Sequence, residues 1–195
     1  MIYFIRWVRY LSPNNCNDMN KTPLYDSCYQ QEDDNDILLH LLRAKISIDE
    51  STGIRTIDCD KDVFRQEGGC VIAKDGDRLH VCLSQGEKVQ VPDGVRSIAF
   101  SAFHYGLCPN VRHVVFPQSV EAISGYAIAS ETVEEVTIHN AEAYISDYAF
   151  SWCLSLRAIH YPLLNKTIYL ESKPTRQVRY VEEVTEEWAD EDLPF

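Results

Sequence analysis

The sequence predicts a mainly β solenoid of about three to four coils, built from short stacked parallel strands with few short helices and closed by caps. Three similar segments follow one another in the middle of the chain. Their equivalent residues Pro92, Pro117, His139 and Pro162 are separated by 25, 22 and 23 residues, which is too short for a repeat made of two helices. A unit of this length cannot cover its own apolar side, so successive units must stack and share one core.

Apolar residues recur at fixed spacing in each segment, at positions expected of stacked strands. They are Val111, Val114 and Phe116, then Val133, Val136 and Ile138, then Leu156, Ile159 and Tyr161. Each unit also contains a small residue followed by a large one: Ala102-Phe103, Ala127-Ile128 and Ala149-Phe150. This pairing should let each coil pack closely on the next.

These residues resemble the BspA-like, or treponemal-type, leucine-rich repeat, whose pattern is approximately LxxIxIPxxVxxIgxyAFxxCxxL. The resemblance covers residues 69–162, includes a hairpin-like unit at 69–82, and is closest at residues 145–156. In the second unit Ile128 replaces the Phe and the Cys is absent, which predicts a shortened coil. The resemblance implies a leucine-rich-repeat solenoid with an interaction role, which in many relatives is adhesion or host contact at the cell surface.

The flanks are predicted to form an extension, two caps and a tail. Residues 1–35 should be a partly irregular N-terminal extension, because the stretch before Asp36 is polar. Residues 36–68 should be an N-terminal cap, made of a short helix from Asp36 and a hairpin of residues 46–48 and 54–57. Residues 163–195 should be a C-terminal cap with strands at 167–170 and 178–181, followed by an acidic tail.

Composition excludes several kinds of partner. A net charge of -12 and a pI near 4.8 argue against nucleic acid, because neutralising phosphates requires clustered Lys and Arg. The apolar residues 1–11 are interrupted by Arg6 and Arg9 and fall far short of the roughly 20 residues that span a bilayer. We therefore expect no nucleic-acid partner and no transmembrane segment.

The cysteines bear on both chemistry and localisation. There are seven, without a CxxC pair, and an odd number of this kind favours a reducing compartment. With no clear signal peptide, the cytoplasm is favoured, whereas the resemblance points to the cell surface; the sequence leaves both open. Cys108 and Cys153 follow the Ala-Phe positions and are predicted to be buried, unreactive thiols.

Two features that could bind a metal ion have better explanations. Residues 58–62 alternate carboxylates like a calcium loop, but Val63 stands where an EF-hand needs Gly, and Gly69 where it needs Glu. A solvated turn or a helix start is predicted instead. His113 and His160 should lie two repeats apart, roughly 10 Å at the usual strand spacing, which is too far to share one metal ion. No metal site is predicted.

The residues between the apolar strand positions are expected to point outward and to form a partner-binding face. They are Arg112, His113, Val115, Glu134, Glu135, Thr137, Arg157 and His160. Adjacent coils would then present positive, negative and positive charges side by side. Exposed solenoid sheets commonly serve as binding surfaces, although such mixed charges could equally compensate one another.

The predicted function is a non-enzymatic module that binds a protein or glycan through this face, without a cofactor. No GxGxxG, P-loop, HExxH or GxSxG motif is present to indicate an enzyme. One alternative is a compact intracellular binder or inhibitor of a basic protein, which the acidic charge would suit. Another is a structural piece of a larger assembly.

Overall fold

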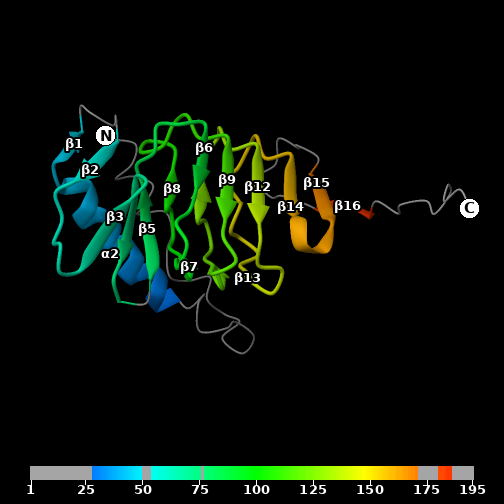
Figure 1. Ribbon diagram of the computed structural model, residues 1–195, viewed down its shortest axis with the longest axis horizontal. Helices are drawn as coiled ribbons and strands as arrows, with labels where there is room; N and C mark the ends of the chain where they lie inside the picture. Colours follow the sequence, from blue (N-terminus) through cyan, green and yellow to red (C-terminus); the bar gives the residue numbers. More distant parts are fainter. Residues whose placement is uncertain (1–27, 50–53, 76, 171–179, 186–195) are drawn as a thin grey trace, which may run out of the picture.

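The computed structural model describes residues 28–49, 54–75, 77–170 and 180–185, and it shows a β-solenoid of about four turns (Figure 1). Each coil passes through up to three sheets. Sheet 1 holds the parallel strands β6 (Lys88–Gln90), β9 (His113–Phe116), β12 (Glu135–Ile138) and β14 (Ala158–Tyr161). Sheet 2 holds β7 (Ser97–Ile98), β10 (Ala122–Ile123) and β13 (Tyr144–Ile145), and sheet 3 holds β8 (Phe103–His104) and β11 (Ile128–Ala129).

Equivalent apolar residues stack from coil to coil, as the repeat predicts. Val114 pairs with Val136, which in turn pairs with Ile159, and all three side chains are fully buried. Burying a side chain of this size contributes about 1.5–3 kcal/mol. The predicted leucine-rich-repeat solenoid is therefore confirmed.

The small-large pairs also lie in the core. Ala102, Ala127 and Ala149 are fully buried, and the Phe103 ring packs edge-on against Phe116 with centroids 5.9 Å apart. The second coil, which was expected to be shortened, is the shortest of the three, with 22 residues from Pro117 to His139. It still contributes a strand to each of the three sheets, and its buried Ile128 pairs with Phe103. It is the third coil, residues 139–157, in which the structure has no strand of sheet 3.

The N-terminal cap extends sheet 2. Strand β5 (Arg78–Cys82) pairs in parallel with β7 and in antiparallel with β4 (Cys70–Ala73), which pairs with β3 (Phe64–Glu67). Strands β1 (Ile46–Ile48) and β2 (Arg55–Ile57) form the predicted hairpin. Helix α2 (Cys28–Arg43) packs on β5 and belongs, through its buried leucines, to a second apolar cluster with the cap strands (Figure 1). Among the described residues, no helix is long and apolar enough to cross a membrane.

The start of this helix corrects one prediction. The helix begins at Cys28 and not at Asp36, so residues 28–35, predicted as part of an irregular extension, are helical. The rest of that extension, residues 1–27, lies outside the described residues. The polar run before Asp36 was interpreted as solvated loop, but its Asp34 is buried because it has a charged partner on β5.

The C-terminal cap extends sheet 1. Strand β15 (Lys166–Leu170) pairs in antiparallel with β14, and β16 (Tyr180–Thr185) pairs with β15. A single 3₁₀ turn, η3 (Pro162–Leu164), joins β14 to β15, and Asn165 closes it with a left-handed φ of 48°. The first predicted cap strand is confirmed. The second was predicted at 178–181; residues 178 and 179 lie outside the described residues, and the described strand extends to Thr185. The acidic tail beyond residue 185 lies outside the described residues.

A buried ion pair fastens helix α2 to the solenoid. Asp34 accepts hydrogen bonds from Arg78 Nε at 2.9 Å and from Arg78 Nη2 at 2.5 Å, and a third from the backbone N–H of Phe100 at 3.0 Å. Arg78 Nη2 also donates to Ser124 Oγ at 2.9 Å. Asp34 and Arg78 are 3% and 8% exposed. One pair thus connects the helix, the cap sheet and the turns of two coils.

Breaking this pair should destabilise the whole chain. We expect Asp34→Asn to lower the free energy of unfolding by about 3–5 kcal/mol, because it leaves the Arg78 charge buried without a counterion. Asp33→Asn, at the exposed neighbouring position, is the matched control and should change stability by less than about 0.5 kcal/mol. Guanidinium chloride unfolding measures both. Equal midpoints for the two variants would contradict the role assigned to Asp34.

Two buried histidines make the fold sensitive to acid. Burial lowers the pKa of His80 from 6.5 to about 4, and Arg78 adds to this effect while Asp34 opposes it. Burial likewise lowers the pKa of His104 to about 4. Both side chains are therefore neutral in the folded protein at neutral pH.

This shift predicts the direction of the pH dependence. Between pH 6.5 and 4 the unfolded chain binds protons at these histidines and the folded chain does not, so stability falls as the pH falls. From pH 7 to pH 5 the loss should be about 2 kcal/mol for each histidine. The free energy of unfolding, measured at pH 7 and at pH 5, should fall less in the double variant His80→Asn with His104→Asn than in the parent chain. An equal fall in the two proteins would show that other groups cause the acid sensitivity.

Candidate functional site

The outward side chains of sheet 1 form two rows that run across its strands, and we call this surface the outer face. Register places His113, Glu135, Ala158 and Tyr169 in one row, and Val115, Thr137, His160 and Thr167 in the other. The rows arise because successive residues of a strand point to opposite sides. The inward neighbours Val114, Val136 and Ile159 hold the strands on the core, so the sequence alternation sets the outer face.

A third row lies where the chain enters these strands. Arg112 Nη1 donates to Glu134 Oε1, and Arg157 Nη2 lies 3.4 Å from Glu134 Oε2. Backbone hydrogen bonds of 2.8 Å, from Glu134 N to Arg112 O and from Arg157 N to Glu134 O, keep the three residues in line. The Glu134 side chain is 20% exposed, whereas those of Arg112 and Arg157 are 51% and 71% exposed. The predicted positive, negative and positive charges are therefore paired with one another.

The histidines of the face share one carboxylate. His113 Nδ1 lies 3.0 Å from Glu135 Oε2, and His160 Nε2 lies 3.7 Å from the same oxygen. The two rings are thus closer than the roughly 10 Å expected from strand spacing alone, because both lean toward Glu135. We call these three residues, together with Arg112, Glu134 and Arg157, the charge ladder.

The structure brings most of the predicted face together, with one exception. Val115 is only 7% exposed, although its strand position points outward. In register it lies between Gln90 and Thr137, and the longer or branched neighbours shield its short side chain. Val115 is therefore part of the packing of the face and not of its accessible surface.

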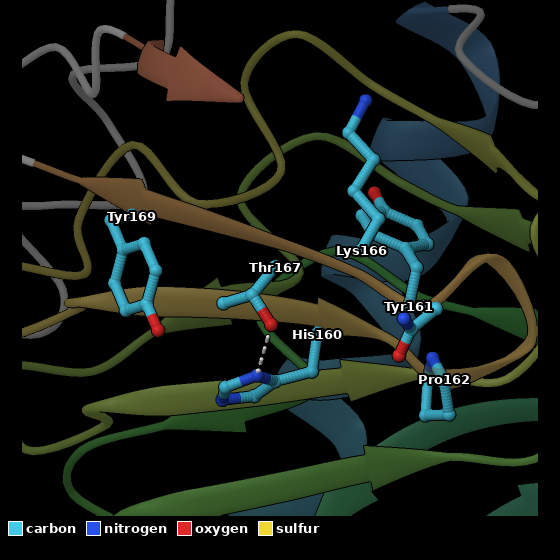
Figure 2. A pocket seen from close by; sticks show the side chains of 7 residues that line it. His160, Tyr161, Pro162, Lys166, Thr167 and Tyr169 are labelled. Carbon is cyan, nitrogen blue, oxygen red and sulfur yellow. Dashed lines mark hydrogen bonds between the residues drawn. The ribbon is translucent and has the colours of Figure 1, made fainter. Parts of the chain in front are cut away.

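A pocket of about 250 Å³ opens at the C-terminal end of the outer face. Its lining residues are His160, Tyr161, Pro162, Asn165, Lys166, Thr167 and Tyr169. Figure 2 shows His160, Thr167 and Tyr169 side by side on β14 and β15, with Lys166 directed away from them. His160 Nδ1 lies 3.1 Å from Thr167 Oγ1, so the pocket is continuous with the charge ladder through His160.

Sequence reasoning missed most of this pocket. It predicted the strand that contains Thr167 and Tyr169 but treated it only as a cap. The signal was the alternation of Thr167 and Tyr169 with the apolar Ile168 and Leu170, which pack on the core. Polar and aromatic residues at alternate positions of a half-buried strand indicate an exposed row, and β15 continues the two rows of the repeats.

The other candidate sites named in the sequence can also be located in the structure. Among the described residues, no three His, Cys, Asp or Glu side chains are placed to hold a metal ion. Residues 58–62 form a turn, in which Asp62 N donates to Asp60 Oδ1 at 2.8 Å. Cys108 and Cys153 are buried. Burial raises the pKa of the Cys153 thiol to about 12, which disfavours the thiolate, the reactive form, at neutral pH.

Stacked coils with an open strand face define a class of repeat proteins, the leucine-rich-repeat solenoids. Residues 81–173, just under half of the chain, match the family model described as a BspA type leucine rich repeat region of six copies. This segment therefore belongs to the BspA-type leucine-rich repeats, as the sequence resemblance predicts. No curated protein and no solved structure matches the chain.

Proposed function

We propose that the chain is a non-enzymatic interaction module and that the outer face of sheet 1 binds its protein partner. The membership of residues 81–173 in a leucine-rich-repeat family supports an interaction role in general. The observation that supports this particular surface is its register: two rows of outward side chains, polar or aromatic except for the buried Val115 and Ala158, cross β9, β12, β14 and β15. Helix α2 packs on the other sheet, against β5.

The charge ladder determines which groups are available to a partner. Each arginine has five N–H donors in a fixed fork, and its contact with Glu134 leaves other donors facing solvent. Arginine is also enriched among the residues that dominate binding energy in protein interfaces. We infer that Arg112 and Arg157 supply the main polar contacts, while Glu134 holds them in place.

A pull-down with matched charge variants tests this surface. Arg112→Ala with Arg157→Ala removes two positive charges from the face, and Arg43→Ala with Lys45→Ala removes two exposed charges at the end of helix α2. We expect the first pair to lower partner recovery at least about tenfold, the effect of losing roughly 1.4 kcal/mol, and the second to leave it unchanged.

Two other results would contradict the assignment of the outer face as the binding surface. Equal recovery by both double variants would place the binding surface elsewhere on the chain. Equal loss in both would indicate that net charge, and not the outer face, attracts the partner. Circular dichroism must first show that each variant has the parent fold.

The pocket favours a second candidate, a glycan ligand. A sugar ring has an apolar C–H side and a rim of hydroxyl groups, so it suits an exposed aromatic ring with polar groups beside it. Tyr169 is 56% exposed, and His160, Thr167 and Asn165 line the same pocket. With Lys166 directed away from these side chains (Figure 2), a neutral sugar fits this arrangement better than an acidic one.

Neutral oligosaccharides can be tested directly by saturation-transfer NMR on the full chain. Cellobiose, lactose and chitobiose serve as probes, compared between the parent chain, Tyr169→Ala and Leu163→Ala. Leu163 is an exposed apolar residue outside the pocket lining, so it is the matched control. We expect transfer that Tyr169→Ala abolishes and Leu163→Ala retains. No transfer from any probe, or transfer that survives Tyr169→Ala, would reject the pocket as a neutral-sugar site.

A further inference from the structure

Three buried thiols meet where the N-terminal cap joins the first coil. Cys70 of β4 and Cys82 of β5 are partners in the antiparallel register, and Cys82 is also within hydrogen-bonding reach of Cys108. All three side chains are fully buried. None of them belongs to the outer face, so a role for these thiols is independent of the proposed function.

The backbone hydrogen bonds show which kind of pair Cys70 and Cys82 form. Leu83 N donates to Gly69 O at 2.7 Å, and Cys82 N donates to Ala102 O at 2.8 Å instead of to Cys70. The bond from Leu83 to Gly69 lies one residue beyond the pair on each strand, so Cys70 and Cys82 are a non-hydrogen-bonded pair. In such pairs the Cα atoms are about 4.5 Å apart, within the range of about 4.4–6.8 Å that a disulfide spans.

We propose that Cys70 and Cys82 are a site of disulfide formation, which closes when the chain folds in an oxidising environment. The thiolate of one cysteine attacks oxidised glutathione to give a mixed disulfide and one reduced glutathione. The other cysteine then loses its proton and attacks this mixed disulfide, which releases the second reduced glutathione. Two thiol protons leave, and the two electrons reside in the two glutathione thiols. The product links β4 to β5.

The bond must form during folding and not afterwards. In the folded chain the hydrogen bond with Cys82, together with burial, raises the pKa of the Cys70 thiol well above its usual range. The same causes raise the pKa of the Cys108 thiol, whereas hydrogen bonds with Cys108 and Cys70 lower the pKa of the Cys82 thiol well below its usual range. Because all three side chains are fully buried, glutathione cannot reach even the Cys82 thiol without local opening, so a folded and reduced chain should react very slowly. Cys108 is not opposite either residue in this strand pair, so the register favours Cys70 as the partner of Cys82.

Peptide mapping of the refolded full chain tests the site. The chain is unfolded with reductant, refolded in a mixture of oxidised and reduced glutathione, blocked with N-ethylmaleimide and cut with trypsin without reduction. Lys and Arg positions separate the three thiols, because Cys70 falls in peptide 66–74, Cys82 in peptide 79–88 and Cys108 in peptide 97–112. We expect peptides 66–74 and 79–88 to be recovered joined, and peptide 97–112 to be recovered blocked.

Variants and the folded chain complete the test. Cys153→Ser removes a buried thiol of a different coil and should leave the joined peptides unchanged, whereas Cys70→Ser should leave Cys82 blocked. Folded, reduced protein placed in the same buffer without denaturant should remain unlinked. Recovery of Cys70 and Cys82 both blocked after refolding, or of Cys82 joined to Cys108, would overturn the proposal. Fast disulfide formation in the folded protein would contradict the claim that the bond forms only during folding.

Discussion

Covering the two ends of the stack is the constraint on which the rest of this structure depends. Coils that share one core present apolar side chains at the first and last turn, and these would face water if the repeats simply stopped. At one end sheet 2 reverses into the antiparallel strands β5, β4 and β3, and at the other sheet 1 reverses into β15 and β16. Ile168 and Leu170 of β15 pack on the core of the repeats. Each cap therefore extends a different sheet.

The N-terminal cap carries an extra requirement, because helix α2 must be held in one orientation on it. Apolar contacts through Leu38 and Leu41 bury one side of the helix but do not fix its orientation. The pair of Asp34 with Arg78 fixes the orientation, because the Asp34 carboxylate accepts hydrogen bonds from two arginine nitrogens and from the backbone N–H of Phe100. Burying both charges is costly, and the close geometry of these hydrogen bonds offsets part of that cost, although Arg78 Nη1 is buried without a hydrogen-bond partner among the described residues. The helix and the first coils consequently depend on each other.

The repeats could be predicted from the sequence because their apolar residues recur at a regular, short spacing along the chain. Val114, Val136 and Ile159 recur at a spacing that only stacked coils explain, and the two cap hairpins follow from short apolar alternation. Asp34 could not be assigned, because its partner Arg78 is 44 residues away and an acidic run looks the same whether it is solvated or paired. The burial of Val115 also depends on neighbours in other coils, which one strand does not show.

For the site, sequence alternation correctly placed the charged rows but gave no account of how they interact. The pairing of Glu134 with both arginines depends on the register of three coils, and the pocket depends on the turn at Asn165, which brings β15 alongside β14. The resemblance seen in the sequence ends at residue 162, before that turn, so it offered no guide to Thr167 or Tyr169, although the match to the family model extends to residue 173. Sites at the junction of a repeat and its cap are hard to predict for this reason.

Parallel stacking also limits what kind of binding surface these coils can form. Equivalent residues lie about 4.8 Å apart, so repeating one charge would place like charges at a distance where repulsion is about 1 kcal/mol even in bulk water. This chain alternates instead, with Glu134 between two arginines and Glu135 between two histidines. The buried core holds the coils together, and the alternation avoids repulsion between the charges of the outer face, so the row of Arg112, Glu134 and Arg157 is not of one sign. For the partner proposed above, geometry and uncharged groups should therefore add selectivity to the contacts of the two arginines, and Thr167 and Tyr169 in the pocket are such groups.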